Sequence, residues 1–230
     1  GFIAIGSYSG AILGKMMNGL PGLFAGMAVG VVISVIVAFL VGLPTLRLKG
    51  DYLAIATLGV AEIIRVAVTN MKITNGAAGI SGVPLTNTWT ITYIALVLTT
   101  ILILNYTFSS AGRATYAVLQ DEIAAESMGV QVTKYKILAF VLGAATASIG
   151  GTLSATTLGA VTPGDFTFMK SIDVLIIVVF GGIGSFTGSF VAAVLLGIIN
   201  LVLQPFGQLR MIIYAVALIL IMIFRPGGLL

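Results

Sequence analysis

Glu62 and Arg65 form one pair of opposite charges inside an apolar segment, and they are the first candidates for chemistry. They stand three residues apart within residues 52–69, which are otherwise mostly apolar. Residues i and i+3 share a helix face, so these two side chains can neutralise each other. Each charge alone would cost about 2.5–3.5 kcal/mol at the centre of a membrane-spanning helix. The pair therefore predicts either mutual neutralisation, with Arg65 reaching toward the outer headgroups, or a polar face toward a transport path or a neighbouring subunit.

The longest polar stretch, residues 112–136, carries a second group of charges. Residues 113–128 are rich in good helix formers, and Glu122 and Glu126 stand four residues apart within them. Ser109 or Ser110 is suited to cap the start of this helix, because a serine side chain can accept a hydrogen bond from the first free amides. We expect a single short surface helix from Arg113 to Met128 on the cytoplasmic side.

Two small residues in this helix, Ala124 and Ala125, leave room for another protein to approach closely. Gly129 is placed to end the helix, because glycine adopts the left-handed conformation that helix ends often require. A solvated connecting helix without any partner is the alternative, and the residues alone do not decide between the two.

A third feature is the run of glycines that includes Gly181, Gly182 and Gly184. The apolar segment before it, residues 172–183, has about 12 residues and would be roughly 18 Å long as a helix. A hydrocarbon core is about 30 Å thick, so this segment is too short to cross it. The glycines indicate either close packing of neighbouring helices or a broken helix that lines a path.

The composition excludes most other chemistry. The chain contains no His and no Cys, so it offers no thiolate or imidazole ligand for a metal and no Cys–His or Ser–His catalytic pair. No Gly-Lys-Ser or Gly-Lys-Thr sequence for binding ATP is present, and no basic run suits nucleic acid. We expect no catalytic residue, no metal and no cofactor in this chain.

The elements that hold these residues are predicted to be transmembrane helices. Apolar residues make up 59% of the 230 and charged residues only 8%, which is too few to cover a soluble domain. The expected fold class is all-α, a polytopic transmembrane helix bundle with a short cytoplasmic helix. The candidate spans are residues 1–14, 22–44, 52–69, 89–108, 137–158, 172–183, 188–203 and 210–224.

Lys and Arg near the segment ends favour one orientation, in which residues 109–136 are cytoplasmic and residues 70–87 and 159–171 lie outside. The basic residues on the cytoplasmic side would be Arg47, Lys49, Arg113, Lys134, Lys136 and Arg225. Those on the outer side would be Lys15, Lys72, Lys170 and Arg210. The chain opens at Gly1 in apolar sequence, and we expect this to be the tail of a helix whose beginning is missing.

Several separate motifs in this order resemble one family, the membrane permease subunits of branched-chain amino acid ABC importers. The matching stretches run along nearly the whole chain: 48–59, 62–65, 74–84, 112–129, 166–172, 181–185 and 224–229. The chain is similar to the longer of the two homologous permeases that such importers pair.

The resemblance implies that residues 1–230 form a single permease domain, with residues 109–136 as its cytoplasmic coupling loop. Its ATPase-coupling residues are then Asp121, Glu122, Ala124, Ala125, Glu126 and Gly129. Candidates for the translocation path are Glu62, Arg65, Gly181, Gly182 and Gly184.

The implied partners are a second permease, homologous or identical, together with cytoplasmic ATPase subunits, an external substrate-binding protein and the lipid bilayer. No nucleic acid is expected, and ATP would be used by the partner. The implied location is the cytoplasmic membrane of a bacterium or archaeon, crossed several times.

Two other classes of function stay open at this point. An ion-gradient-driven transporter or channel for small polar solutes would need a mid-membrane acid, and Glu62 is the clear candidate. A structural subunit of a larger membrane complex would need no path at all. Residues 109–136 discriminate between the classes, because only an ATP-driven importer requires them to bind an ATPase.

Overall fold

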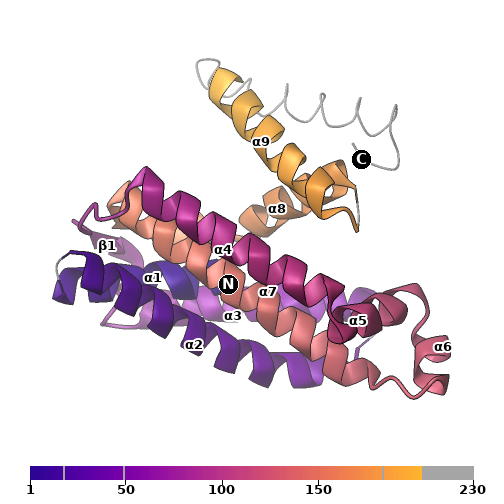
Figure 1. The fold of residues 1–230 in the computed structure, drawn as a ribbon. Coiled ribbons are helices and arrows are strands. Elements are labelled where there is room, and N and C mark those ends of the chain that lie inside the picture. The colour runs from indigo at the N-terminus through magenta and orange to yellow at the C-terminus, as the bar shows by residue number, and fades with distance from the viewer. Residues whose placement is uncertain (18, 49, 183, 204–230) are drawn as a thin grey trace. The chain divides into compact units, whose positions relative to one another are not determined.

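The computed structural model describes residues 1–17, 19–48, 50–182 and 184–203, and most of them are helical (Figure 1). The chain divides into two compact units, residues 1–167 and residues from 168 onward, each described here by itself. Nine α-helices are described: α1 Phe2–Met16, α2 Leu20–Thr45, α3 Asp51–Asn70, α4 Trp89–Phe108, α5 Ser110–Gln120, α6 Glu122–Ser127, α7 Val132–Leu158, α8 Phe168–Gly181 and α9 Phe186–Leu203. Two 3-10 helices and two short strands join them: η1 Gly76–Ala78, β1 Ile80–Ser81, β2 Ala160–Val161 and η2 Pro163–Phe166.

The predicted fold class, an all-α polytopic helix bundle, is confirmed. Four of the described helices (α2, α3, α4 and α7) are long and apolar enough to cross a membrane, so the chain is a multi-pass membrane protein. Each predicted span up to residue 203 corresponds to one helix. The predicted segment 210–224 and the charges of Lys49 and Arg225 lie outside the described residues. The single permease domain over residues 1–230 stays a prediction.

The core of the first unit consists of α1, α2 and α7, which pack through small residues. A Cβ atom built at Gly6 of α1 would lie 2.0 Å from the carbonyl oxygen of Ser148 in α7. One built at Gly26 of α2 would lie 2.7 Å from the Cα atom of Gly10. No side chain fits at such distances, so the glycines allow the three backbones to touch.

Hydroxyl groups connect the same helices across these close approaches. Ser7 Oγ donates to the carbonyl oxygen of Gly151 at 2.9 Å, and Thr152 Oγ1 donates to that of Gly6 at 2.9 Å. Both donors are buried, so each hydrogen bond satisfies a group that water does not reach. Close packing therefore joins α1, α2 and α7, and these two bonds strengthen the contact of α1 with α7.

The loops gather at opposite ends of this unit. β1 and β2 pair antiparallel at one end, with Ile80 opposite Val161 and Ser81 opposite Ala160. The helices α5 and α6 lie at the other end (Figure 1). Segments 70–87 and 159–171 were predicted to share one side of the membrane, and the strand pairing confirms this for the residues around it.

Two spanning helices lie on the periphery of the first unit. Val68 is the one buried residue of α3, and α4, which is described throughout, has none. Their apolar side chains are therefore free to face lipid or another subunit.

The second unit has α8 packed against α9 at the glycine run. A Cβ atom at Gly181 would lie 2.5 Å from the carbonyl carbon of Gly188, and one at Gly188 would lie 2.0 Å from the carbonyl oxygen of Gly181. Phe180, Ala192 and Leu196 form the buried core of this helix pair. The predicted short segment is observed as α8, whose 14 residues span about 21 Å.

Candidate functional site

The candidate coupling site begins where α4 ends and α5 turns away from it. Ser109 is the N-cap of α5, and its Oγ accepts a hydrogen bond from the Gly112 amide at 3.1 Å, as one of the two predicted caps. Arg113 donates to the carbonyl oxygen of Phe108 at 3.0 Å. A cation at this position interacts favourably with the carbonyl groups that are left without helical partners at the end of α4.

The single helix predicted from Arg113 to Met128 is wrong, because the backbone breaks at Asp121. This residue is extended, with φ −155° and ψ 112°, and it separates α5 from α6. Its Oδ1 accepts hydrogen bonds from the amides of Ile123 at 2.9 Å and Ala124 at 3.1 Å. Aspartate in a helix interior competes for backbone amides, and here it wins by capping a new helix.

The end of α6 follows the prediction at Gly129. This residue has φ +83°, and its amide donates to the carbonyl oxygen of Glu126 at 2.9 Å. The amide of Val130 donates to the carbonyl oxygen of Ala125 at 3.0 Å. The two bonds form a Schellman motif, which requires a left-handed residue and so favours glycine.

The two predicted small residues of α6 face different ways. Ala124 is exposed, whereas Ala125 is only 5% exposed and is buried within the chain itself. Ile123 and Met128 are 78% and 83% exposed. The face available to a partner is therefore formed by Ile123, Ala124, Glu126 and Met128, and we call it the α6 outer face.

The two predicted glutamates of α6 also differ. Glu122 forms an ion pair with Lys136 of α7, so its charge is partly committed within the chain. Glu126 is exposed and forms no ion pair with any described residue. The pairing of Lys136 with Glu122 was not predicted. No local sequence pattern indicates it, because the two residues are 14 positions apart.

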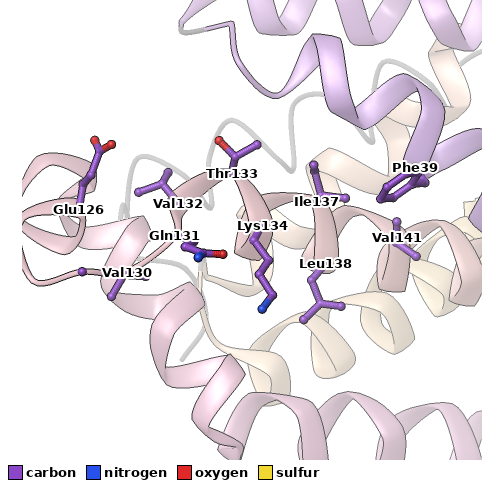
Figure 2. A pocket seen from close by; sticks show the side chains of 11 residues that line it. Phe39, Glu126, Val130, Gln131, Val132, Thr133, Lys134, Ile137, Leu138 and Val141 are labelled. Carbon is purple, nitrogen blue, oxygen red and sulfur yellow. The ribbon is translucent and has the colours of Figure 1, made fainter.

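A groove of about 820 Å³ lies beside α6, between the start of α7 and α2 (Figure 2). Figure 2 shows Lys134 and Leu138 pointing to one side of α7, while Ile137 lies on the side toward Phe39 of α2. Glu126 points away from Lys134. The groove is mainly apolar, and all of its lining residues lie within 126–141 except Phe39 of α2.

The predicted pair in α3 is formed. Arg65 Nε donates to both carboxylate oxygens of Glu62 at 3.0 Å, and an Nη atom adds a further contact. Both side chains are partly exposed, and neither belongs to the buried core cluster of the first unit. Mutual neutralisation is therefore confirmed, and a contact with a path or a neighbouring subunit stays a prediction.

The predicted glycines lie at the junction of α8 and α9. Gly181 is needed for the close approach to Gly188, which supports the packing explanation. Gly182 and Gly184 have φ values of +104° and +95°, a conformation that other residues rarely adopt. A role of this turn in a path stays a prediction.

A second groove, of about 530 Å³, lies between α4 and α7. At its edge, Asn87 Nδ2 donates to Thr92 Oγ1 at 2.9 Å and to Thr157 Oγ1 at 2.8 Å. Thr99 and Thr146 also line it. In the described part of the chain, no group of three or more acidic residues lies together in a way that would hold a metal ion.

Comparisons with known proteins find a matching family and several similar proteins. A family model described as "Branched-chain amino acid transport system / permease component" matches residues 1–224. The high-affinity branched-chain amino acid transport system permease protein LivM is 36% identical in Salmonella typhimurium (strain LT2) and 35% identical in Escherichia coli (strain K12), each over 265 residues. Both alignments cover 100% of this chain, and the chain spans 62% of the length of these relatives.

The permease protein LivH of Escherichia coli (strain K12), of the same named system, is 30% identical over 144 residues. That alignment covers 62% of this chain and 46% of LivH. No solved structure matches the chain.

Proposed function

The chain belongs to the family of branched-chain amino acid transport system permease components, and we propose that it is the membrane-spanning permease subunit of an ATP-binding-cassette importer. Its substrates would be branched-chain or closely related amino acids. The names of LivM and LivH, two permease proteins of a high-affinity branched-chain amino acid transport system, support this substrate class.

The observation that carries the proposal is the position and form of α6. This helix of six residues lies at the end of the first unit, outside the four long apolar helices, and exposes an outer face of mixed character. Ile123 and Met128 offer apolar contact area, Ala124 allows close approach and Glu126 offers an unpaired charge. A small apolar centre with a charged rim is typical of a protein–protein contact.

The proposed partner of the α6 outer face is a cytoplasmic ATPase subunit. ATP binding and hydrolysis would move this partner, and α6 would pass the movement to the membrane helices. Because this chain has no sequence for binding ATP, the hydrolysis would take place on the partner, and the chain itself would be a transport subunit and not an enzyme.

A second permease, homologous or identical, would complete the path. The ion pair of Glu62 and Arg65 is partly exposed on a peripheral helix, α3. A pair of charges is more favourable against protein or water than against lipid, which supports a contact of this face with the path or with the second permease. The turn of Gly181, Gly182 and Gly184 is the other candidate for the path.

The remaining partner would be an external substrate-binding protein that delivers the amino acid. The loops at the β1–β2 end lie opposite α6, so they would face this protein if α6 faces the cytoplasm (Figure 1). The proposed location is the cytoplasmic membrane of a bacterium or archaeon.

The alternative of an ion-gradient-driven transporter has less support. Such a mechanism needs a mid-membrane carboxylate that is available to H⁺ or Na⁺. The carboxylate of Glu62 already accepts hydrogen bonds from Arg65, which leaves it less available to an ion.

Reconstitution tests the proposal. The chain is co-expressed with the second permease and the ATPase encoded with it, and the purified complex is placed in vesicles that contain ATP. We expect the ATPase to co-purify and labelled leucine, isoleucine or valine to accumulate only when ATP and the binding protein are present. Uptake that is driven by an ion gradient without ATP would contradict the proposal.

A further inference from the structure

The ion pair between Glu122 and Lys136 joins the coupling helix to a membrane-spanning helix. Lys136 Nζ contacts Glu122 Oε1, and both side chains are partly buried. The two residues also line one cavity of about 790 Å³, whose other walls include Phe2 of α1, Leu53 of α3 and Phe140 of α7. The pair therefore lies beside a cavity that several helices of the first unit line.

The backbone does not hold α6 rigidly on either side. Asp121 is extended, so the hydrogen-bonded helix of α5 does not continue into α6. Gly129 is left-handed and ends α6 before α7 begins at Val132. Since both connections are breaks in the helix, side-chain contacts add to the covalent backbone in carrying a force from α6 to the membrane helices.

Two side-chain contacts are available for this purpose. One is the burial of Ala125, which offers a single methyl group. The other is the ion pair, which reaches Lys136 in the second turn of α7. Further along α7, Thr152 is hydrogen-bonded to α1 at Gly6, so a displacement of α7 also acts on α1.

We propose that the Glu122–Lys136 ion pair transmits the movement of α6 to α7, so that both are positioning residues for transport. The proposal rests on the proposed function, in which an ATPase moves α6. It assigns Glu122 a partner within the permease, whereas the sequence alone suggested a basic group on the ATPase. Charged side chains pair where their positions allow, and α7 brings Lys136 to α6 before any partner binds.

The chain offers a matched control for the lysine of the pair. Lys134 lies two residues from Lys136 in α7 and forms no ion pair with the described residues. Neutralising Lys134 therefore removes the same charge without breaking the link.

The test compares Glu122→Gln, Lys136→Gln and the exchanged double variant Glu122→Lys with Lys136→Glu, all in the reconstituted importer. Two quantities are measured: the amount of amino acid imported per ATP hydrolysed, and the Kd of the ATPase for the permease. We expect each single variant to lower import per ATP by roughly fivefold, the size expected for loss of one partly exposed ion pair. The Kd should stay within about twofold, and the exchange should restore most of the import.

The control Lys134→Gln should keep the import per ATP of the unaltered protein. Single variants that import normally would overturn the proposal. A raised Kd in Glu122→Gln that the exchange does not restore would also overturn it, because Glu122 would then meet the ATPase directly. Failure of the unaltered complex to bind the ATPase or to need ATP would instead refute the proposed function, so the two failures are distinct.

Discussion

Replacing Ala124 with tryptophan tests whether the α6 outer face is the ATPase contact. Ala124 is exposed, so a large side chain at this position clashes with nothing in the permease and acts only when a partner docks. Its neighbour Ala125 is 5% exposed and gives the opposite case. The same substitution at the two adjacent positions therefore separates docking from folding.

The expected magnitudes differ for the two variants. Ala124→Trp changes the stability of the permease only through helix propensity, by less than about 0.7 kcal/mol. It should weaken ATPase binding by about 2–4 kcal/mol, the range found when a central interface contact is lost, which corresponds to roughly 30- to 1,000-fold in Kd. Ala125→Trp should instead destabilise the permease by about 1–3 kcal/mol, because a bulky side chain is forced into a filled space.

The assay has two parts for each variant. Binding of the ATPase to purified permease gives the Kd, and thermal unfolding in detergent gives the stability of the permease. Ala124→Trp should raise the Kd and abolish uptake in vesicles without lowering the unfolding temperature. Ala125→Trp should lower the unfolding temperature.

An unchanged Kd and full uptake in Ala124→Trp would refute the reasoning, since a docked α6 outer face has no room for an indole ring. Loss of binding in Ala125→Trp at unchanged stability would show that α6 presents its other face to the partner.

Three further predictions concern the membrane helices. Glu62→Gln leaves a guanidinium unpaired in α3 and should reduce the amount of inserted permease, by up to about 2.5–3.5 kcal/mol of insertion free energy, measured as membrane-bound protein. A single cysteine at Gln120 should react with an impermeant maleimide only from the cytoplasm, and one at Ile73 only from outside. Gly181→Ala should destabilise the packing of α8 and α9 by about 1–3 kcal/mol, measured by thermal unfolding, because the new Cβ would lie 2.5 Å from backbone atoms.

Each of these predictions has a clear contradicting result. Normal insertion of Glu62→Gln would show that the pair contributes little to assembly. Labelling from the reversed sides would invert the orientation and leave the bundle intact. Gly197→Ala is the control for Gly181→Ala, because no atom lies within 4 Å of the added Cβ. Equal destabilisation by both would exclude close packing as the reason for Gly181.

The sequence alone determined the features that follow from local rules. A chain with only 8% charged residues has to place its helices in lipid, and the apolar runs mark those helices to within a few residues. Ser109 and Gly129 were found as helix ends, because a capping hydroxyl and a left-handed glycine act within a few residues of their own position.

The tertiary structure decided which side chains of the coupling helix are free. The break at Asp121 turns α6 relative to α5, and this rotation decides that Ala125 is buried while Ala124 is exposed. The pairing of Glu122 with Lys136 depends on how α7 returns past α6. Helix propensity and periodicity describe one segment at a time, so they carry no information on such contacts between segments. The position of the coupling helix could therefore be predicted from the sequence, and the division of its side chains between exposed and buried could not.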